Sequence, residues 1–168
     1  MASIAIRGAE PGDIGLILSF VRELAEYERA PEQAVATPEQ MRRALFGDPA
    51  VDGRGAGVAE CVIGLLDGEP QGFALFFHNF STWSGRPGVY LEDLFVRPSA
   101  RGSGLGRALL VHLAKIAVDR GCGRFEWSVL DWNEPALGFY RSLGAEPMKE
   151  WIIHRVSGEA LARLAEMA

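Results

Sequence analysis

The positions of apolar and polar residues along the chain predict alternating strands and helices. After Asp13, apolar side chains recur every three or four residues, as on the buried side of an amphipathic helix. Thr37, Pro38 and Gln40 have the pattern of a helix start, with proline in the first turn and a capping box. The pattern predicts strands at residues 4–7, 58–66, 71–80, 89–96, 125–130 and 151–156, and helices at 13–30, 37–46, 104–120, 133–143 and 157–168.

The order of these elements indicates an α/β (α+β) fold in a single domain covering residues 1–168. Residues 67–70 have the composition of a turn between two strands, which predicts an antiparallel hairpin. Helices are interspersed among the strands, so we expect a mixed, mostly antiparallel central sheet with helices on both faces. In the last helix, Leu161 and Leu164 are expected to face inward.

Composition narrows the class of protein. The chain has 168 residues, 48% of them hydrophobic and 23% charged, which suits a folded domain rather than a disordered chain. No apolar run approaches the roughly 20 residues of a membrane span, and the first residues lack the pattern of a signal peptide. The net charge of −5 argues against nucleic-acid binding and suits a cationic small molecule. We expect a cytoplasmic protein that binds neither nucleic acid nor membrane.

The two cysteines, Cys61 and Cys122, carry little chemistry in this pattern. Neither has a second cysteine or a paired histidine at metal-ligand spacing. We therefore expect buried free thiols and no metal site.

Residues 96–110 contain the most informative motif. A predicted strand ends at Val96, and the run Arg-Gly-Ser-Gly-Leu-Gly-Arg at 101–107 then leads into a helix. Glycines let the backbone turn sharply, and the start of a helix presents unpaired N–H groups, so the two together can hold a phosphate or diphosphate. A Walker A loop would need Gly-Lys-Ser/Thr, and a dinucleotide fingerprint would need a small residue in place of Arg107. The alternative to a phosphate-binding loop is an ordinary glycine turn before a helix, without a ligand.

Glu92 and Asp93 interrupt a strand that is otherwise apolar. A buried carboxylate without a partner is costly, so these residues require an explanation. Strand alternation predicts that their side chains point to opposite faces. The two carboxylates could form a salt bridge or lie at an exposed edge of the sheet. Alternatively, Glu92 faces a cleft, binds the ammonium form of an amine and takes its proton.

The glycine motif belongs to a wider resemblance. Residues 101–106 resemble the pyrophosphate loop of the GNAT superfamily of N-acetyltransferases, which binds coenzyme A, and the strand at 90–96 and the run at 133–140 fit the same superfamily. Segments 23–28, 90–93 and 132–135 resemble its diamine (spermidine/spermine) N-acetyltransferase branch. The resemblance covers residues 4–156.

The resemblance implies acetyl-CoA as co-substrate, held in a gap where two strands of the sheet splay apart. Backbone groups of the strand would bind the pantetheine arm and stabilise the developing oxyanion. The cofactor-binding residues implied are Leu94, Phe95, Val96, Arg101, Gly102, Ser103, Gly104, Leu105, Gly106, Arg107, Asn133, Ala136 and Tyr140.

The same resemblance implies the catalytic roles. Glu92 would bind and deprotonate the amine, and Tyr140 would protonate the departing thiolate. Asn133 and Tyr140 are about two helical turns apart and share a face. No acid–histidine–nucleophile set is apparent, which favours direct transfer over a covalent acyl-enzyme.

Acceptor-binding residues are expected near these two. Tyr27 and Glu28 match positions that line the amine site of the branch, although a solvated helix end is an equally good interpretation. The branch tends to carry an acidic residue before a tryptophan, and Glu150-Trp151 fits that pattern only with an alignment gap. Trp83 could present an aromatic face to a cation. The expected substrate-binding residues are Tyr27, Glu28, Trp83, Glu92, Asp93 and Glu150.

We therefore expect an N-acetyltransferase that acts on a small primary amine, either a polyamine or diamine or an amino-acid side chain such as that of thialysine. Two alternatives stay open at this point: a protein or peptide N-acetyltransferase, and a non-catalytic sensor that binds acyl-CoA. The resemblance also implies a homodimer whose site is built partly from both chains.

Overall fold

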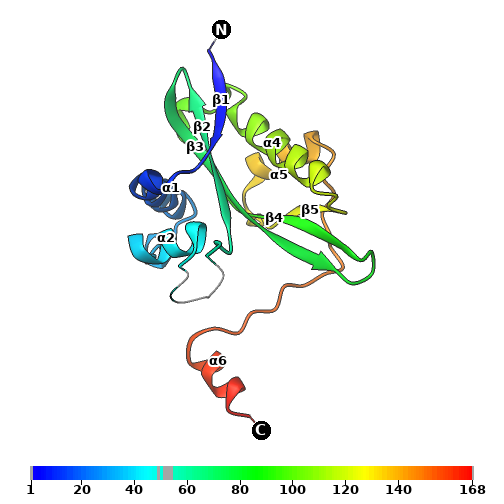
Figure 1. Cartoon of the computed structure of the whole chain (residues 1–168). Coiled ribbons are helices and arrows are strands. Elements are labelled where there is room, and N and C mark those ends of the chain that lie inside the picture. Colours follow the sequence, from blue (N-terminus) through cyan, green and yellow to red (C-terminus); the bar gives the residue numbers. More distant parts are fainter. Residues whose placement is uncertain (1, 49, 51–54, 168) are drawn as a thin grey trace. The chain divides into compact units, whose positions relative to one another are not determined.

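The computed structural model describes residues 2–48, 50 and 55–167, which form two units, residues 1–128 and 129–168 (Figure 1). The first unit contains a five-stranded sheet in the order β1-β2-β3-β4-β5. Its strands are β1 (Ile4–Gly8), β2 (Glu60–Leu66), β3 (Glu69–Ser81), β4 (Arg86–Val96) and β5 (Phe125–Trp127). Its α-helices are α1 (Ile14–Tyr27), α2 (Pro38–Phe46) and α4 (Leu105–Asp119), and the second unit contains α5 (Glu134–Ser142) and α6 (Gly158–Ala165).

The sheet is antiparallel except at one edge. The first four strands pair antiparallel with their neighbours, and β4 pairs with β5 in parallel. This confirms the predicted mixed, mostly antiparallel sheet. The predicted capping box is also present, because the Thr37 side chain accepts a hydrogen bond from the Gln40 N–H while the Gln40 side chain accepts one from the Thr37 N–H.

The two faces of the sheet are covered by different helices of the first unit. Ile63 and Phe73 pair across β2 and β3 and pack with Ile17 of α1 in one core cluster. The next residue along β2, Gly64, points to the opposite face, where an added Cβ would lie 3.0 Å from the Leu105 Cδ1 of α4. Helices therefore cover both faces, as Figure 1 also shows for α1 and α4.

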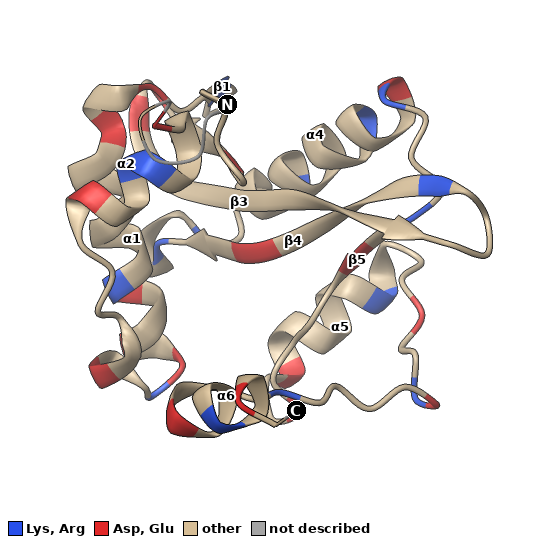
Figure 2. Cartoon of the chain, turned by 60° about the horizontal axis from the view of Figure 1, so that its bottom comes forward, with Lys and Arg blue, Asp and Glu red and all other residues tan. Residues whose placement is uncertain are grey.

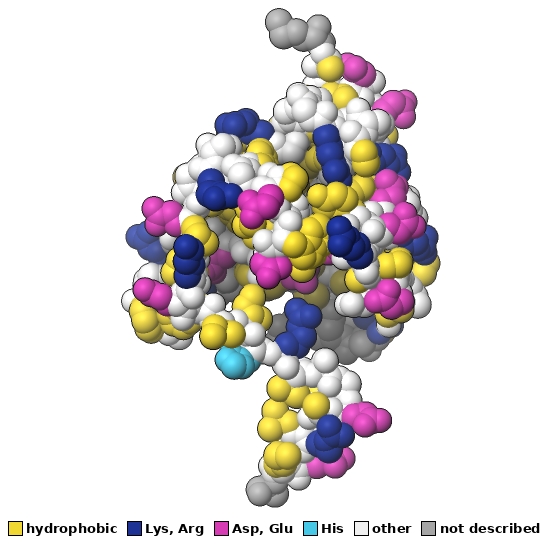
Figure 3. All heavy atoms as spheres, turned by 180° about the vertical axis from the view of Figure 1, so that it is seen from behind, with side chains coloured by type: hydrophobic (Ala, Val, Ile, Leu, Met, Phe, Trp, Pro, Cys, Tyr) yellow, Lys and Arg dark blue, Asp and Glu magenta, His cyan; other side chains and the backbone are white. Residues whose placement is uncertain are grey.

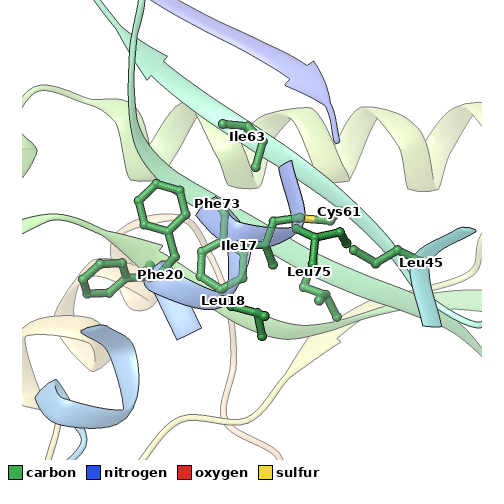
Figure 4. Close-up of a cluster of buried hydrophobic side chains, with 10 residues drawn as sticks. Ile17, Leu18, Phe20, Leu45, Cys61, Ile63, Phe73 and Leu75 are labelled. Carbon is green, nitrogen blue, oxygen red and sulfur yellow. The ribbon is translucent and has the colours of Figure 1, made fainter. Parts of the chain in front are cut away.

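The core under α1 is built on aromatic side chains. The rings of Phe20 and Phe73 are stacked with centroids 5.5 Å apart and planes 6° apart, and both are fully buried (Figure 4). The Phe95 ring lies 6.3 Å from that of Phe20. These contacts fix α1 against β3 and β4, since buried aromatic rings supply much of the apolar area that drives packing.

A β-bulge interrupts the β3–β4 ladder at Glu92. Leu75 pairs with Asp93 and the next residue, Phe76, pairs with Leu91, so Glu92 has no partner opposite it. One extra residue in a strand changes which side chains face which side of the sheet. Leu91 and Asp93 are two apart in sequence yet point to opposite faces, because they pair with consecutive residues of β3.

Three predictions about local structure are wrong. The strand predicted at 125–130 ends at Trp127, where its pairing with β4 also ends. No strand forms at 151–156, because β5 is the last strand of the sheet in the part of the chain that the structure describes. Leu161 and Leu164 of α6 are 53% and 52% exposed rather than turned inward. The predicted loop at 48–57 falls largely outside the described residues.

Candidate active site

The carboxyl group of Asp93 lies on the same face of the sheet as α1. Asp93 pairs with Leu75, which pairs in turn with Cys61, and both of these residues belong to the core cluster under α1. The bulge therefore turns Asp93 toward α1 and leaves Glu92 exposed beside it. This acidic stretch is the red segment of β4 in Figure 2.

The environment of Asp93 favours its neutral form. Burial, together with the negative charges of Glu92 and Glu28, raises the pKa of its carboxyl group to about 6. Among the described residues, these two acidic groups are the charges that act on it. A carboxyl group held this way gains a large electrostatic benefit from a cation, because the cation would offset both the desolvation and the like-charge repulsion.

Glu28 reaches this region because of how α1 ends. The helix ends at Tyr27, and Arg29 follows with a left-handed φ of 62°. The N–H groups of Arg29 and Ala30 donate to the carbonyl groups of Glu26 and Ala25, which closes the helix end. Burial also raises the pKa of the Glu28 carboxyl group, although the residue is exposed at the surface as a whole.

Two arginines hold the second half of α1 against the segment that follows β4. The Arg97 guanidinium forms a forked ion pair with Glu23, with Nη2 2.7 Å from Oε1 and Nε 2.9 Å from Oε2, and it lies 4.7 Å from the centroid of the Phe20 ring. Tyr27 lies one turn after Glu23 on α1, and the Arg101 guanidinium lies 4.6 Å from the centroid of its ring. The sequence analysis missed Arg97 and Glu23, because no local motif connects two residues so far apart in sequence.

The glycine motif forms a loop of the kind expected for an anion. A short 3-10 turn (Pro98–Ala100) leads into Gly102 and Gly104, which have left-handed φ values of 78° and 94°. Ser103 stabilises the turn, because its Oγ donates to the Ala100 carbonyl and accepts from the Leu105 N–H. The N–H groups of Gly106 and Arg107 then lie in the first turn of α4, where a helix provides no internal acceptor.

The residues present therefore fit a diphosphate-containing co-substrate such as acetyl-CoA. Left-handed backbone at Gly102 and Gly104 is available to glycine at little cost, and the N-terminus of the 15-residue α4 favours an anion. Next to this loop, β4 continues from Glu92 to Val96 while the β4–β5 ladder ends at Leu91 and Trp127. Leu94, Phe95 and Val96 therefore pair with β3 alone in the described sheet, and the gap predicted beside them stays a prediction.

The other candidate residues belong to the turn between β3 and β4 and to the second unit. Trp83 is in the turn between β3 and β4 and is 90% exposed. The stretch of β4 from Arg86 to Asp93 spans roughly 23 Å at about 3.3 Å per residue, so Trp83 does not line the surroundings of Asp93 in its own chain. Asn133, Ala136, Tyr140 and Glu150 belong to the second unit.

Within that second unit, one predicted contact is present. Asn133 caps α5, since its Oδ1 accepts a hydrogen bond from the Ala136 N–H at 3.3 Å. Tyr140 lies in the same helix, and its ring centroid is 5.5 Å from that of Phe139. Glu150 is exposed, directly before Trp151.

The remaining candidate features are the charged surface, membrane-spanning helices, metal sites and the two thiols. Figure 3 shows basic and acidic side chains interspersed over the face that it displays. In the described part of the chain, no helix is long and apolar enough to cross a membrane, and no group of three or more His, Cys, Asp and Glu side chains is arranged to hold a metal ion. Cys61 is free and buried as predicted, and burial raises the pKa of its thiol to about 12; Cys122 is free but only partly buried.

Comparison with known proteins gives the family and, with it, the class of enzyme, an acyltransferase. Residues 21–145 match the model of the acetyltransferase (GNAT) family. The chain belongs to that family, whose members in general use acetyl-CoA as the donor.

Individual relatives are more specific. The chain is 39% identical over 176 residues to the thialysine N-epsilon-acetyltransferase of Sus scrofa, covering 98% of this chain and 99% of that protein. It is 29% identical to the spermidine/spermine N(1)-acetyltransferase-like protein 1 of Homo sapiens, covering 95% of this chain and 23% of that protein. Among solved structures, it is similar to an integron cassette protein of V. cholerae, with a TM-score of 0.78, 27% identity and 98% of each chain covered. The thialysine and the spermidine/spermine relatives agree with the predicted resemblance to the diamine (spermidine/spermine) N-acetyltransferase branch.

Proposed function

We propose that this protein transfers the acetyl group of acetyl-CoA directly to a primary amine of a small cationic acceptor. The acceptor is an amino-acid side-chain amine such as that of thialysine, or a diamine or polyamine. The observation that carries the proposal is the acidic cluster of Glu28, Glu92 and Asp93, in which burial and then the neighbouring charges raise the pKa of Asp93 to about 6. A cationic amine is the ligand that such a cluster favours most.

The comparisons favour the amino-acid acceptor over the polyamine. The relative named for thialysine is more similar to this chain than the relative named for spermidine and spermine, at 39% against 29% identity. The first of these similarities also extends over nearly the full length of both proteins.

The proposed reaction is a direct displacement at the thioester. The acceptor nitrogen, in its neutral form, forms a bond to the acetyl carbon while the bond from that carbon to sulfur breaks. A proton leaves the nitrogen for Glu92, and Tyr140 gives a proton to the sulfur, so that the products are an amide and a free thiol. Asp93 and Glu28 hold the acceptor cation, and the backbone of Leu94, Phe95 and Val96 stabilises the oxyanion.

A thiol-release assay with acetyl-CoA tests the proposal. The acceptor panel would contain thialysine, lysine, ornithine, putrescine, spermidine and a short peptide with a free N-terminus. We expect small amines to be acetylated and the peptide to be poor. Preference for the peptide would support the alternative of a protein N-acetyltransferase, and tight binding of acetyl-CoA without any acetylation would support a sensor.

Variants separate the assigned roles. General acid–base groups typically contribute about 10²- to 10⁴-fold, so Glu92→Gln and Tyr140→Phe should each lower kcat by about 10²-fold or more. Asp93→Asn should mainly raise the KM for the amine. The control is Glu69→Gln, which removes an exposed carboxylate at the start of β3 and should leave both constants unchanged. Full turnover in both the Glu92 and Tyr140 variants would disprove these assignments.

We also propose a homodimer in which each site is built from both chains. The position of Trp83 supports this, because it lies too far along β4 to contact the acidic cluster of its own chain but could reach that of another. Light scattering after size-exclusion chromatography would give the mass in solution. A monomer with full activity would rule the shared site out.

A further inference from the structure

The Arg101 guanidinium contacts the end of α1 and the end of β4. Its guanidinium carbon lies 4.6 Å from the centroid of the Tyr27 ring and 6.0 Å from that of Phe95. Its Nε donates a hydrogen bond to the Val96 carbonyl at 3.1 Å. A cation over an aromatic face is attracted by the ring quadrupole, and the bond to Val96 fixes the guanidinium in that position. The side chain therefore connects the end of β4 to the end of α1.

A second arginine makes a parallel connection. Arg97 pairs with Glu23 one turn earlier on α1, so arginines four residues apart contact helix residues four apart. Four residues make about one helical turn, so Glu23 and Tyr27 lie on one side of α1. The segment between β4 and the glycine loop thus holds α1 at two successive turns.

The glycine motif and the start of α4 offer groups other than the Arg101 side chain to a diphosphate. The N–H groups of Gly106 and Arg107 lie at the N-terminus of α4, and the Arg107 side chain is exposed in its first turn. These groups are of the kind that bind an anion at a helix N-terminus. Arg101 can therefore serve a different purpose from the one its place in the motif suggests.

The position of Tyr27 matters because Glu28 follows it directly. The charge of Glu28 acts on the Asp93 carboxyl group, so the two carboxyl groups lie close enough to interact. A small shift of Tyr27 would carry Glu28 with it and change the spacing of this acidic pair. Exact spacing of charges is what distinguishes one small cation from another.

We infer that Arg101 is a positioning residue for the acceptor: it holds Tyr27, and through it Glu28, in place for amine binding. This inference rests on the proposed acetylation of a small cationic amine. It assigns the first residue of the glycine motif to the affinity for the acceptor rather than to the grip on the diphosphate.

Steady-state kinetics with both substrates varied would test the assignment. Arg101→Ala should raise the KM for the amine by roughly three- to tenfold, as expected for loss of a partly exposed cation–ring contact, and leave the KM for acetyl-CoA within about twofold. Arg107→Ala is the matched control, because it removes the other arginine of the motif and should raise the KM for acetyl-CoA instead. Arg101→Lys retains a cation over the ring and should recover part of the loss.

A double-variant cycle gives the sharper readout. If Arg101 acts through Tyr27, then Arg101→Ala should have little further effect on the amine KM in a Tyr27→Leu background. Tyr27→Phe retains the aromatic face, so Arg101→Ala should raise the amine KM by the same factor in a Tyr27→Phe background as in the wild-type background.

Two results would overturn the inference while the proposed function stands. One is a rise in the acetyl-CoA KM of Arg101→Ala with an unchanged amine KM, which would mean that Arg101 binds the diphosphate. The other is full additivity with Tyr27→Leu. By contrast, wild-type protein that acetylates no small amine would defeat the proposed function itself.

Discussion

Replacing Asp93 by asparagine should make the protein more stable at neutral pH and less active. The wild-type carboxyl group has its pKa raised from 3.8 to about 6 in the folded protein, mainly by burial. Folding therefore favours the protonated form, and the native state binds more protons than the unfolded state between these two values. Stability from this group is lost as the pH rises through that window. Asparagine, which is always neutral, removes the penalty.

The magnitude follows from the two pKa values. With an unfolded value near 3.8 and a folded value near 6, ionisation of Asp93 costs about 1 kcal/mol at about pH 4.5 and about 3 kcal/mol at about pH 7.5. The advantage of Asp93→Asn over the wild type should therefore grow by about 2 kcal/mol between these conditions. Any difference in packing or hydrogen bonding of the amide is the same at both pH values and cancels.

Urea unfolding of both proteins at the two pH values would measure this growth. The control is Asp13→Asn, because the Arg7 guanidinium lowers the pKa of the Asp13 carboxyl group. That variant should lose stability relative to the wild type by nearly the same amount at both pH values, because both lie above the Asp13 pKa in the folded and in the unfolded state. A stability difference for Asp93→Asn that stays constant with pH would refute the reasoning, since it would mean that the carboxyl group titrates alike in both states.

Three further substitutions test other parts of the structure. Gly104→Ala places a side chain on left-handed backbone and should cost about 1–2 kcal/mol in unfolding free energy and weaken acetyl-CoA binding in calorimetry; unchanged binding would show that the loop tolerates another conformation. Gly15→Ala should stabilise α1 by roughly 0.5–1 kcal/mol in the same unfolding assay, since an added Cβ meets nothing within 4 Å, and a loss of stability would contradict that packing. Phe73→Ala removes a fully buried ring stacked on Phe20 and should cost about 3–5 kcal/mol, whereas a cost below 1 kcal/mol would mean that the core refills the space.

Much of the fold could be predicted because its signals are local. The capping box at Thr37 and the glycines before α4 act over a few residues, and the structure has both features where the sequence places them. Apolar periodicity identified the strands and helices of the first unit for the same reason. The strand predicted at 151–156 failed because an apolar pattern does not specify a partner strand.

The candidate site was less predictable because its geometry depends on contacts between distant residues. Strict alternation predicts opposite faces for Glu92 and Asp93, but the bulge interrupts alternation at that point. A bulge is decided by how two strands pair, and neither strand alone reveals it. The contacts of Arg97 with Glu23 and of Arg101 with Tyr27 also join segments separated by most of the first unit. The sequence therefore supplied the residue types of the site, and the fold supplied their arrangement.

The bulge has a consequence for how this chain could change by insertion and deletion. Loss of a residue from a paired strand normally shifts everything beyond it by one position and turns the buried side chains outward. Here the residue without a partner is Glu92 itself, so its deletion would leave Leu91 opposite Phe76 and Asp93 opposite Leu75. Deletion of the Glu92 codon would therefore shorten β4 by one residue and preserve its core contacts. It would remove the proposed base in a single genetic step and leave the scaffold free to acquire another role.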